Sequence, residues 1–208
     1  MNNSTLNTNE DDSAQTREFI DATKAWLEKA VIGLNLCPFA KAVHVKKQIR
    51  YVVSAAHTPE ELQADLAAEL KLLDGADPEQ IDTTLLIHPG VLTDFMDYND
   101  FLEIADATVE QLGLEGHIQV ASFHPDYQFA DTSPDDIDNY TNRSPYPTLH
   151  LLREESVERA IEAFPDAAEI FEKNVETMRR LGRDGWESLG ISVADKQNKT
   201  DIYCKTKN

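Results

Sequence analysis

Residues 118–153 read IQVASFHPDYQFADTSPDDIDNYTNRSPYPTLHLLR, and this stretch decides how the sheet of the protein is built. Two strand-like runs, 118–124 and 148–153, enclose a loop of more than twenty residues. A loop of this length inside a compact domain is uncommon, and it is usually either functional or disordered. Because aromatic residues and prolines recur along it and histidines stand at the strand ends, we predict an ordered loop that forms a functional site.

Outward from this loop, the chain alternates between strands and helices. Apolar alternation predicts two earlier strands, at 48–54 and 82–88. Helical periodicity predicts helices over 17–34, 58–75, 94–112, 154–164 and 166–182, with a short one near 134–140. Thr58 and Glu61 form a capping box at the start of the second of these helices. Since helices connect the first three strands, we expect these strands to be paired in parallel.

This order predicts an α/β fold with a single mixed sheet of about four strands and an extra N-terminal helix. We assign 17–185 to one domain, 1–16 to a disordered tail and 186–208 to a loosely packed C-terminal extension. The order is also that of a thioredoxin-like core, in which the Tyr146–Pro147 bond is a candidate for the cis form. The likeness concerns topology alone, because the segment 88–91 (HPGV) stands where that fold carries a Cys-x-x-Cys motif.

Composition excludes several classes of partner. The net charge is −19, from 19 basic and 38 acidic residues, and such a charge disfavours nucleic acids and anionic membranes. The sequence has no run of about 18 apolar residues and no signal peptide, so we expect no membrane span. With only Cys37 and Cys204, a disulfide framework is unsupported, and a reducing cytoplasm is the expected location.

Three histidines lie at predicted strand ends. His88 and His124 each end a strand and precede a proline, and His150 lies near the start of the last strand. Ligands collect at the carboxyl ends of parallel strands in open α/β sheets. If the last strand is antiparallel, His150 comes close to His124; if it is parallel, His150 lies at the far end. The predicted three-histidine cluster depends on that direction.

The chemistry of such a cluster has three readings. With Asp126 as an oxygen donor, the three imidazoles suit zinc, iron or another transition metal. Without a metal, a histidine there is a candidate general acid or base. The third reading has His88 and His124 hydrogen-bonded to loop backbone and His150 on a sheet face, with no chemical role.

Two kinds of side chain could bind a substrate. Arg143 lies among several aspartates, so it either makes a surface ion pair or holds a substrate carboxylate or phosphate with its planar guanidinium. Tyr127, Tyr140 and Tyr146 either wall a pocket or pack the loop against the sheet. Cys37 follows a helix, whose negative end disfavours a thiolate, so it is either a buried structural thiol or a nucleophile that reaches the histidine edge.

The segments GLNLCPFA (33–40), HPG (88–90), FHPDYQFAD (123–131) and NRSPYPTLHLLRE (142–154) resemble an uncharacterised bacterial family, a domain of unknown function numbered 1415. The resemblance covers about 17–185. It implies a soluble bacterial protein in the cytoplasm, and it assigns no catalytic residue.

The leading hypothesis is a small-molecule enzyme. In this hypothesis His88, His124 and His150 transfer protons or bind a metal, Arg143 binds an anionic group, and Cys37 is a nucleophile or redox thiol. The alternatives are a non-catalytic domain that binds a metabolite or a basic protein, and a thioredoxin-like redox protein with one working cysteine.

Overall fold

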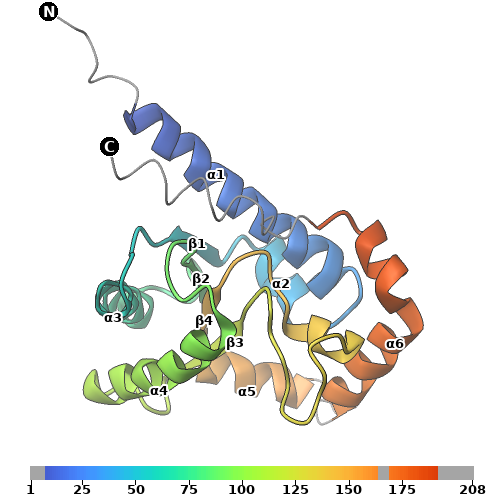
Figure 1. Cartoon of the computed structure of the whole chain (residues 1–208). Helices are drawn as coiled ribbons and strands as arrows, with labels where there is room; N and C mark the ends of the chain where they lie inside the picture. Colours follow the sequence, from blue (N-terminus) through green and yellow to red (C-terminus); the bar gives the residue numbers. More distant parts are fainter. Residues whose placement is uncertain (1–7, 164–168, 192–208) are drawn as a thin grey trace, which may run out of the picture.

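The fold is built on one sheet of four strands in the order β1-β2-β4-β3 (Figure 1). The structure is a computed structural model that describes residues 8–163 and 169–191. The strands are β1 (Ile49–Val53), β2 (Thr83–Ile87), β3 (Ile118–Phe123) and β4 (Thr148–Arg153). The α/β class and the mixed sheet are confirmed, and each strand lies within one residue of its predicted bounds.

The strand pairing differs from the prediction in one respect. β1 and β2 pair in parallel, whereas β4 pairs antiparallel with both β2 and β3. The first three strands therefore run in one direction, but β2 and β3 are not neighbours because β4 lies between them. The long loop begins where β3 ends and returns the chain to the same end of the sheet, so β4 runs back antiparallel beside β3. Leu149 and Leu151 of β4 are fully buried, which suits a central strand.

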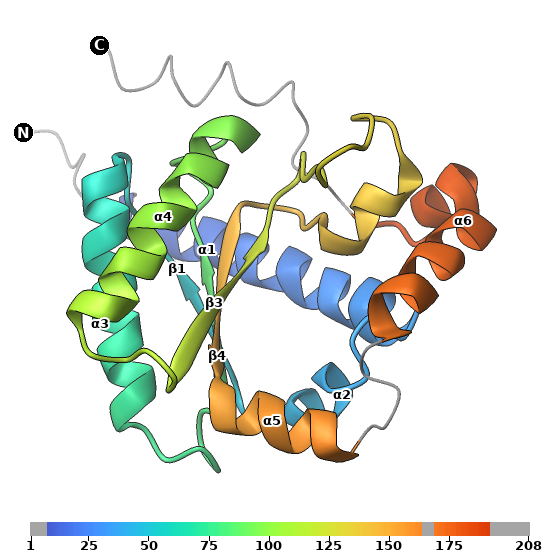
Figure 2. The same ribbon diagram turned by 90° about the horizontal axis from the view of Figure 1, so that it is seen from below.

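Helices cover both faces of the sheet. They are α1 (Thr8–Trp26), the π-helix η1 (Leu27–Ile32), α2 (Ala40–Val45), α3 (Pro59–Gly75), α4 (Phe95–Gln111), the 3-10 helix η2 (Ile137–Asn142), α5 (Glu154–Ala163) and α6 (Ile170–Ser188). Figure 2 shows α3 and α4 on one side of the strands and α1 and α6 on the other. The result is a three-layer α/β arrangement.

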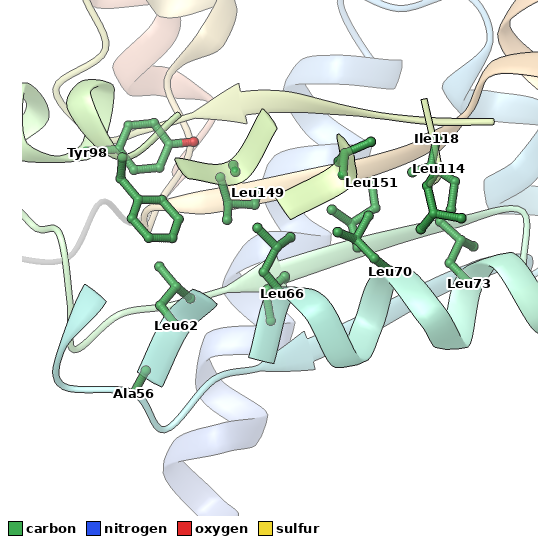
Figure 3. Packing of buried hydrophobic residues seen from close by; sticks show 14 of the residues in the cluster. Ala56, Leu62, Leu66, Leu70, Leu73, Tyr98, Leu114, Ile118, Leu149 and Leu151 are labelled. Atoms are coloured by element: carbon green, nitrogen blue, oxygen red, sulfur yellow. The ribbon is translucent and has the colours of Figure 1, made fainter. Parts of the chain in front are cut away.

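Helix α3 shows how the sequence fixes one face of the core. The Thr58 hydroxyl accepts from the Glu61 N–H at 3.2 Å, and the Glu61 carboxylate accepts from the Thr58 N–H at 3.3 Å, so the predicted capping box is confirmed. Leucines at helical spacing then point toward β4 (Figure 3). These are Leu62, Leu66, Leu70 and Leu73, all fully buried. Truncating one such leucine to alanine typically costs about 2–5 kcal/mol.

The opposite face carries a second apolar cluster. Trp26 and Leu27, at the junction of α1 and η1, pack with Met178 and Trp186 of α6. Ring contacts tie this cluster to the sheet and to the loop: Trp26 lies 5.1 Å from Phe123 between ring centroids. The cluster therefore joins α1, α6 and β3 into one layer.

The described helices extend beyond the predicted domain bounds at both ends. Helix α1 begins at Thr8, within the segment 1–16 that we predicted to be a disordered tail. Helix α6 runs to Ser188 and buries Trp186, although the loosely packed extension was predicted to start at that residue. Residues 1–7, the predicted helix start at 166–168 and the remainder of the extension from 192 onward lie outside the described residues.

Candidate functional site

Two of the three predicted histidines come together at the carboxyl ends of their strands. His88 follows β2 and His124 follows β3, and both rings are completely buried. Both contact one aromatic side chain, Tyr98 of α4: the ring centroids lie 5.7 Å apart for His88, which is stacked on Tyr98, and 5.1 Å apart for His124, whose ring is tilted by 38°. The expected meeting of His88 and His124 at one edge of the sheet therefore takes the form of a His–Tyr–His stack beneath α4.

His150 is not part of this stack. Its neighbours Leu149 and Leu151 pack in the α3–α4 cluster, so His150 points to the opposite face of the sheet. There its Nε2 lies 2.7 Å from the Thr83 hydroxyl and its ring lies 6.0 Å from that of Phe123. The antiparallel direction of β4 was one of the two alternatives, but strand parity separates His150 from the other two histidines.

The predicted metal centre does not assemble. Within residues 8–163 and 169–191, no group of three or more His, Cys, Asp or Glu side chains is arranged to hold a metal ion. The proposed ligand set of His88, His124, His150 and Asp126 is split by the sheet. The ligands of a tetrahedral zinc ion must surround a single point, and side chains on opposite faces of the sheet do not meet at one point.

The two stacked histidines hold the segment that leads into α4. The Nδ1 of His88 lies 3.0 Å from the Val91 carbonyl oxygen, and the Nε2 of His124 lies 3.3 Å from the Leu92 carbonyl oxygen. Leu92 has a φ of 53°, in the left-handed region that non-glycine residues rarely occupy. The imidazoles thus fix the carbonyl groups of a strained turn, which is the third of the readings made from sequence.

The hydrogen bonds and the burial of these rings indicate neutral imidazoles. The Asp126 N–H donates to His124 Nδ1 at 3.0 Å, so His124 carries its proton on Nε2 and donates to Leu92. Burial, with a smaller contribution from the nearby His124, lowers the pKa of His88 to about 4, although the hydrogen bond with Val91 opposes this in part. His88 Nε2 is buried and has no hydrogen-bond partner in the part of the chain that the structure describes. Burial also lowers the pKa of His150 to about 4.

An open cleft of about 560 Å³ lies next to this stack. Its walls come from the start of α4, from the loop between β3 and β4, and from the end of α6; they include Asp94, Phe95, Asp126, Arg143 and Arg183. The volume is within the range of small-molecule pockets. The cleft adjoins the histidine stack through Phe95, whose ring lies 5.5 Å from that of His124. None of the three histidines lines it.

Arg143 is the best-positioned cation of the cleft. Its Nε donates to the Tyr127 carbonyl at 3.2 Å, and its Nη2 donates to the Pro134 carbonyl at 2.7 Å. Its guanidinium carbon lies 4.3 Å from the centroid of the Tyr140 ring. No carboxylate among the described residues pairs with it, so the predicted surface ion pair is not found there. The loop therefore holds the half-buried guanidinium of Arg143 in place without neutralising its charge.

Helix α6 closes the far side of the cleft. Arg179 pairs with Asp138 at 2.6 Å, and the Trp186 ring lies 5.2 Å from the Tyr140 ring. Gly182 interrupts the helix with φ 66° and ψ 178°, which turns the segment bearing Arg183 and Trp186 toward the loop. No local pattern in the sequence indicates that α6 lies at this cleft.

The comparisons with known proteins identify the family. The sequence model of a family described as "Protein of unknown function (DUF1415)" matches residues 18–188. The chain belongs to this family. No curated protein and no solved structure shows a significant match. The description of the DUF1415 family gives no activity, so a function can be inferred only from the geometry of the site.

The predicted substrate-binding tyrosines of this DUF1415 protein lie outside the cleft lining. The Tyr127 ring packs on Phe95 at 5.3 Å, and only its backbone carbonyl serves the site, as the acceptor for Arg143. The Tyr146 ring packs edge-on against Phe19 of α1 at 4.8 Å. Both therefore follow the packing alternative, and Tyr140 is the tyrosine that reaches the cleft.

Cys37 of the DUF1415 protein lies between η1 and α2, packed against the second apolar cluster. Burial raises the pKa of its thiol, although hydrogen bonds with the backbone of Phe39 and Ala40 oppose this in part. A raised pKa disfavours the nucleophilic thiolate. Every peptide bond of the described residues is trans, so the cis Tyr146–Pro147 bond expected for a thioredoxin-like protein is not present.

None of the helices in residues 8–163 and 169–191 is both long enough and apolar enough to cross a membrane.

Proposed function

We propose that this protein binds a small anionic molecule in the cleft, with Arg143 as the anchor for its carboxylate or phosphate group. The observation that carries the proposal is the half-buried guanidinium of Arg143, which faces a cleft of about 560 Å³ and has no carboxylate partner among the described residues. A half-buried guanidinium at a cleft that no carboxylate of the described residues neutralises can bind an anionic group there.

The way Arg143 is held supports an anion rather than a purely structural role. A guanidinium has five N–H donors, and the two loop carbonyls use Nε and Nη2. Nη1 makes no hydrogen bond with the described residues and remains for a ligand. With its plane stacked on Tyr140, the side chain loses little further freedom on binding, which favours planar recognition of carboxylate or phosphate.

The proposed role is ligand binding, in which His88 and His124 position the backbone that leads into α4. His88, His124 and His150 do not line the cleft, and the pKa values of His88 and His150 lie near 4, so these groups are poorly placed for proton transfer to a ligand. The metal-dependent and single-cysteine hypotheses are not supported by the placement of their residues. An acid–base role at the cleft itself would fall to Asp126.

Tryptophan fluorescence provides a direct test. Trp186 lines the cleft, whereas Trp26 is 2% exposed in the core, so Trp26→Phe leaves a single reporter at the site. Benzoate and inorganic phosphate serve as probes. Arg143→Gln should weaken binding at least about tenfold, since a hydrogen bond to a charged group is worth about 1.5–3 kcal/mol. Arg180→Gln, at an exposed position of α6, is the matched control. Equal affinity in the wild type and in Arg143→Gln would refute the proposal.

A further inference from the structure

We infer that the ligand of this cleft carries a tetrahedral dianion, such as a phosphate monoester, attached to a flat apolar body. The inference rests on the proposed function and deepens it. It begins from a second guanidinium: the carbons of Arg143 and Arg183 lie 4.3 Å and 5.9 Å from the centroid of the same Tyr140 ring. Both arginines line the cleft. Two guanidiniums in the lining of one cleft favour phosphate over a singly charged carboxylate.

Arg183 is held loosely enough to turn toward a ligand. Its Nη2 donates to the Asp135 carbonyl at 3.1 Å and lies 3.4 Å from the Asp135 carboxylate, whose side chain is 90% exposed. Exposed pairs of this kind are weak in water. Arg179 differs, because it meets Asp138 at 2.6 Å through two hydrogen bonds and the Asp138 side chain is only 16% exposed. A phosphate oxygen can therefore replace Asp135 on Arg183 while the Arg179 pair keeps the loop in place.

The acidic residues of the cleft determine where the dianion is placed. Asp94 is already engaged, since its carboxylate accepts from the Met96 N–H at 2.9 Å and caps α4. Asp135 is the group that the ligand replaces. Asp126 is a further carboxylate of the lining, so the dianion belongs on the Tyr140 side, where Arg143 and Arg183 lie.

The rest of the lining fits an apolar body. Phe95, Met96, Pro125 and Trp186 line the cleft, and Met96 is 63% exposed although its side chain is apolar. Exposed apolar surface beside fixed polar groups is typical of small-molecule sites. A flat ring against these side chains would place its substituent toward Tyr140, where the guanidiniums lie.

Phenyl phosphate and phenyl sulfate separate the dianion from the monoanion, because the two esters share one shape. At about pH 8 the phosphate is doubly charged, since its second pKa is about 6, while the sulfate keeps one charge. In the Trp26→Phe background, phenyl phosphate should bind at least about tenfold more tightly than phenyl sulfate. Arg183→Gln should weaken phenyl phosphate binding more than phenyl sulfate binding and so reduce this preference, whereas Arg180→Gln should keep both affinities.

The outcomes distinguish the inference from the proposed function. Equal affinities for the two esters in the parent protein, or a loss of both in equal measure in Arg183→Gln, overturns the dianion inference while Arg143-dependent binding stands. Binding of neither ester, or binding that Arg143→Gln does not change, overturns both. Arg183→Lys keeps the charge without the planar fork and should retain part of the preference, and circular dichroism verifies that each variant is folded.

Discussion

Replacing Tyr98 with phenylalanine should destabilise the fold by about 2–6 kcal/mol, because two backbone groups lose a buried partner and each such loss costs about 1–3 kcal/mol. The Tyr98 hydroxyl donates to the Thr148 carbonyl at 2.9 Å and accepts from the Phe123 N–H at 3.1 Å. It therefore joins α4 to the last residue of β3 and the first residue of β4. The ring remains in place, so the substitution removes one oxygen and leaves the stack with the histidines intact.

Tyr51 of β1 is a matched control with the opposite expectation. Its hydroxyl is also buried, but it has no hydrogen-bond partner in the described part of the chain, and burial raises its pKa to about 12. Removing a buried hydroxyl that pairs with nothing leaves no new group unsatisfied. Tyr51→Phe should therefore leave the stability unchanged or raise it by up to about 1–2 kcal/mol.

Urea denaturation of the wild type and of both variants, followed by far-UV circular dichroism, measures the two effects. The slope of free energy against urea concentration should be the same for all three proteins, so that midpoint shifts report stability. The reasoning would be refuted if Tyr98→Phe lay within about 0.5 kcal/mol of the wild type, the range of ordinary surface substitutions. It would be refuted equally by a Tyr51→Phe variant that lost as much stability as Tyr98→Phe.

Two further predictions concern pH and the kink in α6. Burial lowers the pKa of His150 to about 4 from an ordinary value of 6.5, so the unfolded chain binds a proton that the folded chain does not, and stability should fall as pH drops from about 6.5 toward 4. His150→Gln keeps a donor for Thr83 and should reduce the slope of unfolding free energy against pH in that window, whereas an unchanged slope would contradict the assignment. Gly182→Ala should cost about 1–3 kcal/mol, since its φ of 66° and ψ of 178° belong to a region used almost only by glycine. Gly75→Ala, where a Cβ also meets nothing within 4 Å but φ is not positive, should be nearly neutral in the same urea assay.

The sequence was sufficient for the fold where each signal was local. Strand bounds followed from period-2 alternation, and the start of α3 followed from Thr58, Pro59 and Glu61, all within one turn. The order of strands was less accessible, because inserting β4 between β2 and β3 depends on long-range pairing that no local pattern encodes. Likewise, the burial of Trp186 depends on packing against Trp26, far away in the chain.

The site was predictable only in part, for two separate physical reasons. The placement of His150 could have been found from the sequence, since Leu149 and Leu151 on either side of it mark the core face and alternation then assigns His150 to the opposite one. Arg183 could not have been found, because it reaches the cleft only through the kink at Gly182 and the packing of α6 on the loop. Arg143 could be chosen as a candidate because its surroundings, a loop rich in prolines, are local in sequence.

The role of the paired histidines follows from what a neutral imidazole offers in a buried place. The left-handed φ of 53° at Leu92 costs about 1–3 kcal/mol of backbone strain, so contacts with surrounding residues must stabilise this conformation. His124 supplies that support because one nitrogen accepts from the Asp126 N–H while the other donates to the Leu92 carbonyl. A protonated ring would lose the acceptor. Since Asp94 and Phe95 come directly after this turn, His124 shapes the cleft through the backbone although it does not line the cleft itself.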